Sequence, residues 1–586
     1  MNFLAWIGLL FYPFITAAGT DASLHSCENI ISSQCLDRQE VYNATTTIYH
    51  GSSVEPTIAV NPMEPKKMVA VWQQDRISNG GALLAGVAYS RDGGRSWHKA
   101  CIPFQICQGG ISQRSGDEWL SYSADGKKVY LCASVLNATQ EPGTENQFGV
   151  VVAISEDDGA HWCEPRYLIS SMNYISDPGR QFANTDKNSI TADPDDPHKA
   201  IAVWANFNPS ASSHGVAQSS YTTDGGKNWS AVNLVYDPFP DLVQQGLSNG
   251  IQNDNQASNN VVVILPKKGK RPNHNGDWLN FTTRGYAKPG ATNAQYTNDS
   301  FPFQYTLNDI VLIRSRTQGK KWDPHSTIVI PSFVNNLLYT GGYSYDNQGN
   351  ITGGIGTLMR NDQTVPSYNV NPHNGFLYVV YQTSAFRPDQ LQQIGLVVSR
   401  DGGHNWSSPV QINRTSENAI NPQAFAPFVA ITQDGRVGVL YFDFRNDDRS
   451  DLNHTKMDAW LAIYQEVKNP NGGSTQIGLD FVEEIRLSEE SYIAQNGPKT
   501  GQGVMTEGDY QFLCAEEDKF YAIYIKSLEG PFTPPTVFFV DPVHNATVLL
   551  DNNKRTAPFV SIVRNTKDNA CLLLTKELNT DTECCF

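Results

Sequence analysis

The sequence predicts an all-β protein made of repeated four-stranded units, and three observations support this prediction. First, a turn motif with the pattern Ser/Thr-x-Asp-x-Gly-x-x-Trp occurs five times, at Ser90–Trp97, Ser155–Trp162, Thr222–Trp229, Ser315–Trp322 and Ser399–Trp406. Second, each copy follows an apolar run of strand length, such as Leu84–Tyr89. Third, the 586 residues include 46 Gly and 32 Pro, as in turn-rich β proteins, and no convincing amphipathic helix is present.

Each position that the copies of the turn motif share has a physical role in a β-hairpin. The Asp side chain accepts hydrogen bonds from nearby backbone N–H groups and ties the turn to itself. The Gly adopts a positive φ that a residue with a Cβ resists. The Trp packs back onto the hairpin as an apolar anchor. We therefore expect a hairpin at every copy, including the fourth, where Thr317 replaces the Asp.

A second repeat lies between these hairpins. It consists of a short strand, a Pro/Asp/Gly turn and another apolar strand, and its seven members begin near residues 56, 118, 188, 250, 367, 427 and 508. The member near residue 250 is the weakest, and the Lys/Asn/Gly-rich Pro266–Asn308 stretch after it is expected to be a long surface loop. Four-stranded units that repeat in this way predict a β-propeller with six or seven blades, seven being favoured.

The two ends of the chain differ from the repeats. The first residues form an apolar run that ends in small residues, which is typical of a signal peptide. The predicted divisions are a signal peptide at 1–18, a Cys-containing lead-in at 19–50, the propeller at 51–530, and a C-terminal β or tail segment at 531–586 with Cys571, Cys584 and Cys585.

A signal peptide predicts a secreted, extracellular protein. Ten Cys then favour disulfides whose connectivity the sequence leaves undetermined, with neighbouring clusters such as Cys132 and Cys163 expected to form local pairs. Ten Asn-x-Ser/Thr sequons predict a glycoprotein; they begin at Asn43, Asn137, Asn228, Asn280, Asn298, Asn350, Asn405, Asn413, Asn453 and Asn545.

Charge restricts the partners. The formal net charge of −16 argues against nucleic acid and against an anionic membrane surface, and no later stretch is apolar enough for integral membrane association. The 12 His show no metal-ligand spacing, so no cofactor is predicted. A structural Ca²⁺ at Asp193–Asp196 or at Asn446–Asp448 is a less favoured alternative to a solvated turn.

The turn motif resembles the Asp-box, also called the bacterial neuraminidase repeat. The wider pattern is similar to secreted sialidase-like, or exo-α-sialidase-family, proteins over roughly residues 50–525, through Val71–Gly81, Asp186–Pro194, Tyr441–Asn446 and Gly508–Gln511. The resemblance implies Asp-boxes on the outer rim of the propeller. It also implies a glycoside hydrolase that cleaves a terminal acidic sugar from a carbohydrate or glycoconjugate.

Chemistry is expected at the ends of the inner strands, because loops from successive blades meet there around the axis. Charged residues recur at these ends, among them Arg114, Asp117, Glu118 and Lys187. The candidate catalytic residues are Asp75, Arg76, Asp186, Arg360, Arg445, Glu507, Asp509 and Tyr510.

The resemblance implies a role for each candidate. Three arginines, Arg76, Arg360 and Arg445, would hold the substrate carboxylate, because guanidinium groups match carboxylate geometry. Tyr510 would attack the anomeric carbon and so avoid repulsion between a carboxylate nucleophile and the substrate.

The acidic candidates have two implied roles. Asp75 or Asp186 would act as the acid at the glycosidic oxygen, and Glu507 or Asp509 would activate Tyr510. The sequence departs from the family pattern in two places. The Arg-Ile/Leu-Pro signature expected at the first arginine is missing, and no Glu precedes the second arginine where the family places one.

Two other functions fit the same residue types. One is a non-catalytic extracellular propeller that binds glycan or protein on its central face. The other is a polysaccharide lyase that uses Tyr510 with an Arg or Lys. Convergence of the arginines and Tyr510 in one pocket would favour catalysis, whereas arginines that pair with Asp or Glu would favour binding.

Overall fold

A computed structural model describes residues 47–578 of the chain, apart from 107–109, 138–146, 172–182, 208–213, 248–254, 268–275, 288–305, 333–337, 350, 361–364, 468–477, 502, 530–536, 542–545, 551–553 and 566–570. The predicted signal peptide, almost all of the lead-in, and Cys584 and Cys585 lie outside the described residues.

Most described strands belong to seven consecutive groups of four antiparallel strands. Group one contains β1 (Thr47–Val60), β2 (Met68–Ile77), β3 (Ala82–Ser90) and β4 (His98–Ala100). Group two contains β5 (Arg114–Tyr122), β6 (Val129–Asn137), β7 (Gln147–Ser155) and β8 (Arg166–Ser170). Group three contains β9 (Thr185–Ala192), β10 (Ala200–Phe207), β11 (Gly215–Thr222) and β12 (Asn233–Tyr236). Group four contains β13 (Asn255–Ile264), β14 (Trp278–Ala287), β15 (Thr306–Ser315) and β16 (Thr327–Ile330).

The remaining three groups follow the same plan. Group five contains β21 (Ser367–Val370), β22 (Leu377–Thr383), β23 (Gln393–Ser399) and β24 (Val410–Gln411). Group six contains β25 (Ala424–Ile431), β26 (Arg436–Asp443), β27 (Lys456–Glu466) and β28 (Leu479–Arg486). Group seven contains β31 (Phe512–Glu516), β32 (Lys519–Ser527), β35 (Thr556–Asn565) and β36 (Cys571–Glu577).

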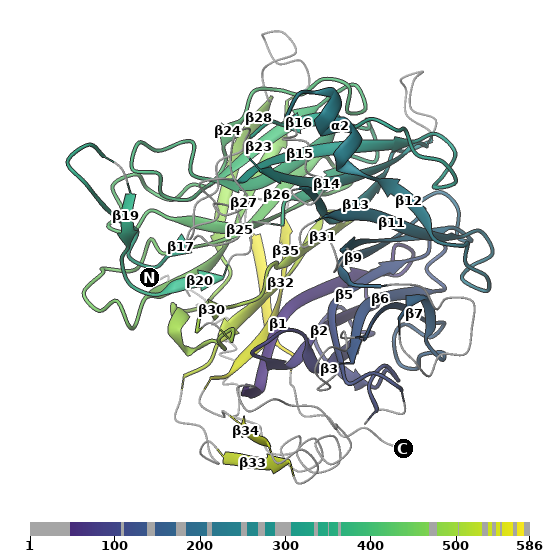
Figure 1. The fold of residues 1–586 in the computed structure, drawn as a ribbon, viewed down its shortest axis with the longest axis horizontal. Helices are drawn as coiled ribbons and strands as arrows, with labels where there is room; N and C mark the ends of the chain where they lie inside the picture. The colour runs from purple at the N-terminus through teal and green to yellow at the C-terminus, as the bar shows by residue number, and fades with distance from the viewer. Residues whose placement is uncertain are drawn as a thin grey trace, which may run out of the picture.

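The groups are arranged around a central axis (Figure 1). The first strand of each group packs against the first strand of the next, and β31 of group seven packs against β1 of group one. A buried hydrogen bond of 2.9 Å from Ser53 N to Thr556 Oγ1 also joins groups one and seven. The predicted all-β propeller architecture is therefore confirmed. The strands of the predicted C-terminal segment include β35 and β36, which complete group seven.

Smaller elements lie between the groups. The short helix α2 (Pro238–Gln244) follows β12, with Asp237 as its N-cap. The others are β17 (Leu338–Tyr339), β18 (Tyr343–Tyr345), β19 (Ile351–Gly354), β20 (Leu358–Arg360), β29 (Tyr492–Ile493), the 3₁₀ turn η5 (Ala494–Asn496), β30 (Met505–Thr506), β33 (Val537–Asp541) and β34 (Ala546–Leu550). Strand β20 pairs with β30, so the insertion after group four reaches the segment that leads into group seven.

One sequence prediction about group four was wrong. The Pro266–Asn308 stretch is not simply a loop, since it contains all of β14 and the first residues of β15. Strand β14 is the hairpin partner of β13, whose ten residues form one continuous strand. Lys, Asn and Gly on both sides of Trp278–Phe281 hide the apolar alternation of a strand that is buried on both faces.

The rim turns have the predicted hydrogen bonds. In the first copy, Ser96 N donates to Asp92 Oδ1 at 2.9 Å, and Gly94 N donates to Ser90 Oγ at 2.9 Å. In the fourth copy, Lys321 N donates to Thr317 Oγ1 at 2.8 Å. A hydroxyl thus accepts the bond that the carboxylate accepts elsewhere, which explains why this turn forms without Asp.

The rim glycine has a second function besides its positive φ. A Cβ placed on Gly94, whose φ is 80°, would lie 2.5 Å from Ile562 Cδ1 of group seven. A Cβ on Gly226 would lie 2.1 Å from Ile154 Cδ1 of group two. Each turn therefore sits directly on the preceding group, and the contact of Gly94 with group seven continues this pattern across the chain ends.

Three structural findings concern the predicted covalent modifications and the membrane. Cys132 and Cys163 are free thiols, as is Cys514, so the predicted pairing of Cys132 with Cys163 is wrong; Cys101 is disulfide-bonded. The sequon residue Asn280 is fully buried, whereas Asn453 is exposed. Among the helices that the structure describes, none is long and apolar enough to cross a membrane.

Candidate functional site

The axis of the propeller is divided by a cluster of aromatic rings. The ring of Trp119 lies 5.6 Å from that of Tyr510 and 5.1 Å from that of Phe512, between centroids. Phe512 in turn lies 4.3 Å from Phe428. One cavity of about 280 Å³ lies at the starts of the inner strands, and another of about 330 Å³ lies towards their ends. We call them the charged cavity and the apolar cavity.

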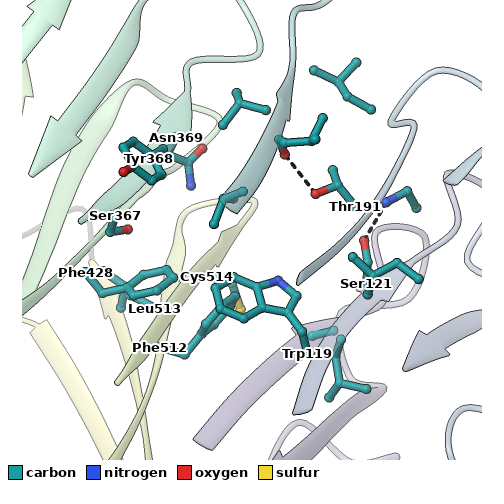
Figure 2. A pocket seen from close by; sticks show the side chains of 18 of the residues that line it. Trp119, Ser121, Thr191, Ser367, Tyr368, Asn369, Phe428, Phe512, Leu513 and Cys514 are labelled. Atoms are coloured by element: carbon teal, nitrogen blue, oxygen red, sulfur yellow. Dashed lines mark hydrogen bonds between the residues drawn. The ribbon is translucent and has the colours of Figure 1, made fainter. Parts of the chain in front are cut away.

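The apolar cavity receives side chains from the first strand of every group (Figure 2). Its polar atoms join neighbouring groups to each other. Ser121 Oγ accepts a hydrogen bond from Ala192 N at 3.0 Å, and Thr191 Oγ1 donates to Val262 O at 2.8 Å. Its described lining contains no Asp, Glu, Lys, Arg or His. This cavity therefore lies in the apolar centre of the propeller, and its lining side chains offer little for acid–base chemistry.

Three β-bulges each contribute a charged side chain to the charged cavity. Glu55 in β1, Asp117 in β5 and Lys187 in β9 each occupy the bulge of their strand, with φ values of 54°, 53° and 50°. A bulge re-aims a side chain, and a left-handed conformation in a non-glycine residue costs on the order of 1–3 kcal/mol. The first strands of groups four and six have the same bulge, at Asn259 and Ala426, so the bulge repeats around the propeller and carries a charged side chain in groups one to three.

Eight charged side chains line this cavity, together with uncharged residues of groups one to three. They are Glu55, Arg76, Arg114, Asp117, Asp186, Lys187, Arg360 and Asp509. Arg360 comes from β20 of the insertion, and Asp509 stands three residues before β31. Residues from five separate parts of the chain therefore meet here.

Asp509 is the anchor of two basic side chains. Its Oδ2 accepts a hydrogen bond from Arg360 Nη2 at 3.0 Å and is also bonded to the ammonium of Lys187, while Arg360 Nε lies 3.0 Å from Oδ1 in the same ion pair. Burial by itself would raise the pKa of Asp509, but Arg360 and Lys187 outweigh this effect and hold the pKa well below its usual range. Asp509 is therefore an ionised, structural carboxylate.

Asp117 and Asp186 form a carboxyl pair. The backbone N–H of Lys187 donates to Asp117 Oδ2 at 2.8 Å and to Asp186 Oδ1 at 2.9 Å, and the two carboxyl groups are hydrogen-bonded to each other. Burial raises the pKa of Asp117 well above its usual range, and the neighbouring Asp186 and Glu55 raise it further despite Lys187. These surroundings therefore favour the protonated form of Asp117.

Glu55 and Arg76 are joined through an amide. Gln73 donates to Glu55 Oε2 and accepts from Arg76 Nη1, while Asp509 N donates to Glu55 Oε1 at 3.2 Å. Within the described part of the chain, neither Glu55 nor Arg76 forms an ion pair closer than 4.0 Å. These two side chains are therefore linked through an uncharged amide and not through a direct ion pair.

The eight predicted site residues fall into two sets. Those that line the charged cavity are Arg76, Asp186, Arg360 and Asp509. Those that do not line it are Asp75, Arg445, Glu507 and Tyr510.

Three of the residues outside the cavity are held by hydrogen bonds, burial or ion pairs elsewhere in the fold. Asp75 Oδ1 accepts from Gly51 N at 2.7 Å. The carboxyl of Glu507 is fully buried, and burial raises its pKa well above the usual range. Arg445 pairs with Asp443 and with Glu484, the latter at 2.6 Å, and stacks 3.8 Å above the ring of Trp460. The structure therefore does not bring the three predicted arginines together.

Tyr510 lies beneath the charged cavity, within the aromatic partition. Burial raises the pKa of its hydroxyl well above the usual range, and Asp117, Glu55, Glu118 and Asp509 raise it further. Among the described residues its hydroxyl has no hydrogen-bond partner. These surroundings oppose the ionised tyrosine that the family resemblance implied.

Sequence reasoning placed Asp117 and Lys187 among the charged residues at the strand ends but not among the catalytic candidates, and it did not single out Glu55. A positional signal exists, because each stands three residues before a buried aliphatic residue of an inner strand, namely Ile58, Leu120 and Ile190. The bulge itself leaves no shared trace in the sequence, since Asp is enriched at a positive φ but Glu and Lys are not.

Comparison with known proteins identifies the rim motif. Residues 88–99 match the model of the BNR/Asp-box repeat, which confirms the resemblance for the first turn. No curated protein matches the chain.

Several solved propeller enzymes match at low similarity. An α-L-arabinanase of Penicillium chrysogenum is 13% identical over 68% of this chain and 94% of its own, with a TM-score of 0.37. A sialidase of Trypanosoma rangeli is 11% identical over 90% and 85%, with a TM-score of 0.36. An ulvan lyase of a polysaccharide lyase family is 9% identical over 91% and 97%, with a TM-score of 0.39. We base no functional conclusion on similarities of this size.

Proposed function

We propose that the chain is a glycan-active propeller enzyme, a glycoside hydrolase that removes a terminal acidic sugar in the charged cavity. The observation that carries this proposal is the hydrogen-bonded carboxyl pair of Asp117 and Asp186 in a cavity that also contains Arg76. A carboxylic acid that keeps its proton at neutral pH is what protonation of a glycosidic oxygen requires.

The charges of the cavity suit one acidic group on the substrate. Four basic side chains face four carboxyl groups, and burial favours the uncharged form of Asp117, which shifts the balance towards positive charge. Arg76 bonds to the uncharged amide of Gln73, so its guanidinium can hold a substrate carboxylate through two parallel hydrogen bonds. This local shift towards positive charge offsets the long-range repulsion from the net charge of −16.

The carboxyl pair performs one of the two roles in hydrolysis. The two acids of a glycosidase stand about 5–9.5 Å apart, on opposite sides of the bond, so two carboxyls that share a hydrogen bond act as a single proton donor. The second role, nucleophile or base, then falls to Glu55, because Asp509 is occupied by Arg360 and Lys187. Gln73 and the Asp509 backbone hold Glu55 in place.

A second candidate function is a non-catalytic propeller that binds acidic glycans. It is favoured by the ion pairs of Arg360 and Lys187 with Asp509, which leave fewer groups for catalysis, and by the absence of Tyr510 from the cavity lining.

The test is product analysis with a variant of the proton donor. The purified chain is incubated with sialosides and with uronic-acid-capped oligosaccharides, and we expect release of the acidic monosaccharide, detected by mass spectrometry. Asp117→Asn should lower the rate about 100-fold or more, because it cannot donate a carboxyl proton. In the parent, the rate should fall as pH rises through the raised pKa of Asp117, since only the protonated form donates.

Controls separate the alternatives. Asp323→Asn, at an exposed rim ion pair with Arg316, should leave the rate unchanged. An unsaturated uronate product would identify a lyase instead, and binding without any product would favour the second candidate. Failure of every acidic glycan to bind would overturn both functions.

We also propose that the protein acts outside the cell, on the basis of the apolar run over residues 1–18. The N-terminus of protein recovered from culture medium, read by mass spectrometry, should follow Ala18. An N-terminus at Met1 on protein found only inside cells would contradict this.

A further inference from the structure

The charged cavity has an apolar side that the proposed reaction does not yet use. Phe148 at the start of β7, its cross-strand partner Leu136 in β6, and Phe207 at the end of β10 all line this cavity. They belong to groups two and three, whereas Arg76 belongs to group one. The carboxyl pair, from β5 and β9, completes the same lining.

Core packing leaves these side chains partly exposed, although Phe148 also packs against the main hydrophobic core. Phe148, Leu136 and Phe207 are half-buried, whereas Ile77 and Leu83, at comparable strand ends in group one, are fully buried. Large apolar side chains kept partly open beside a charged cavity indicate a surface for a ligand.

The Phe207 ring is held in position by its surroundings. Its cross-strand partner is Gly215, and a Cβ on that residue would lie 2.7 Å from the ring carbons. The ring therefore covers bare backbone, where another side chain would displace it. The Phe207 N–H donates to Asn184 O at 2.9 Å, and Asn184 N donates to Asn206 Oδ1 at 3.0 Å. The ring is thus preorganised.

We infer that Leu136, Phe148 and Phe207 form a subsite for a neutral sugar, the residue that leaves when the terminal acidic sugar is cleaved. Sugar rings have apolar C–H faces that pack on aromatic side chains, and Asn184 and Thr185 supply amide and hydroxyl groups at the same wall. Asp186 follows Thr185 directly, so this surface adjoins the proton donor.

This inference rests on the proposed function and specifies its substrate as an oligosaccharide of at least two sugars. The acidic sugar lies on the Arg76 side, and the neutral sugar lies on the Phe207 side. The oxygen between the two rings then faces Asp117 and Asp186.

Binding measurements test the subsite without depending on turnover. Calorimetry is done in the Asp117→Asn background with two matched pairs of ligands: sialic acid and sialyllactose, and glucuronic acid and a glucuronosyl–neutral hexose disaccharide. For the pair that binds, Phe207→Ala should weaken the larger ligand about tenfold and leave the acidic monosaccharide within about twofold. Phe207→Leu should give an intermediate loss for the larger ligand. Phe481→Ala, at an exposed ring in β28, should change neither.

The outcomes separate this inference from the proposed function. If Phe207→Ala weakens the binding of both ligands equally, or of neither ligand, the subsite is overturned. In that case a loss of binding in Arg76→Ala still supports the acidic-sugar site. Unchanged binding in Arg76→Ala overturns the proposed arrangement of the acidic sugar. If the Phe207→Ala chain does not fold, as judged by its thermal unfolding, Phe207→Leu and Phe148→Leu are used instead. The test is again the loss of affinity for the larger ligand compared with the loss for the acidic monosaccharide. Failure of both ligand pairs to bind overturns the proposed function and the subsite together.

Discussion

The rim turns and the charged cavity are both built at strand ends, but they satisfy their charges in different ways. In a rim turn, Asp92 bonds only to residues within four positions along the chain, and each turn is complete in eight residues. In the cavity, Asp509 reaches Glu55 across 454 residues, Lys187 across 322 and Arg360 across 149. A local motif can repeat and tolerate Thr317, whereas the cavity exists only once and depends on closure of the ring.

The largest expected effect is the difference in stability between removing the charge of a buried carboxylate in the cavity and removing that of an exposed carboxylate at the rim. Asp509→Asn leaves Arg360 and Lys187 without their charged partner in a buried site, and we expect the free energy of unfolding to fall by about 3 kcal/mol. Urea unfolding measures this change. Asp323→Asn, which breaks the exposed ion pair with Arg316, should change stability by less than about 1 kcal/mol. Equal effects of the two variants would remove the energetic contrast.

A second prediction concerns pH near the cavity. Burial raises the pKa of Glu118 from 4.5 to about 7, so the folded chain keeps a proton that the unfolded chain loses. Stability from this group is present below pH 4.5 and is lost as pH rises to about 7, by up to about 3 kcal/mol. Glu118→Gln should lack this loss. Asp443, whose pKa burial raises to about 6, contributes in the same direction, so the difference between the parent and Glu118→Gln is the quantity to measure.

The smallest effect is expected at a single rim turn. Asp92→Ala removes hydrogen bonds from Ser96 N and Ser90 Oγ at an exposed site, and we expect a loss of about 1 kcal/mol in unfolding free energy. Thermal unfolding at neutral pH checks it, with binding of acidic glycans unchanged. A loss of glycan binding in this variant would show instead that the rim turn and the charged cavity are coupled.

The sequence predicted the rim better than the site for a definable reason. The Asp, Gly and Trp positions act within one hairpin, so their spacing along the chain is also their spacing in space. Arg76 and Arg360 were predicted as site residues and do line the cavity, but Arg445 has the same residue type at a strand end and instead binds Asp443 and Glu484. Residue type and position at a strand end do not state which way a side chain points.

The hidden strand β14 and the missed Glu55 show the same limit. Trp278 is fully buried in a strand whose neighbours in sequence are typical of loops, and only its pairing with β13 and β15 makes it a strand. Glu55 precedes Pro56 without any motif, and only the bulge in β1 turns it to the cavity.

The amino-acid sequence by itself determined the repeated strands, the all-β propeller and the rim turns, because hydrogen bonds and periodic apolar side chains within short segments specify them. Only the tertiary structure decided which charges meet. Bulges in three neighbouring groups and the insertion strand β20 bring Glu55, Asp117, Lys187 and Arg360 into one buried place with Asp509. Burial there raises the pKa of Asp117, whereas the adjacent Arg360 and Lys187 lower that of Asp509, although both are aspartates at the entrance of an inner strand.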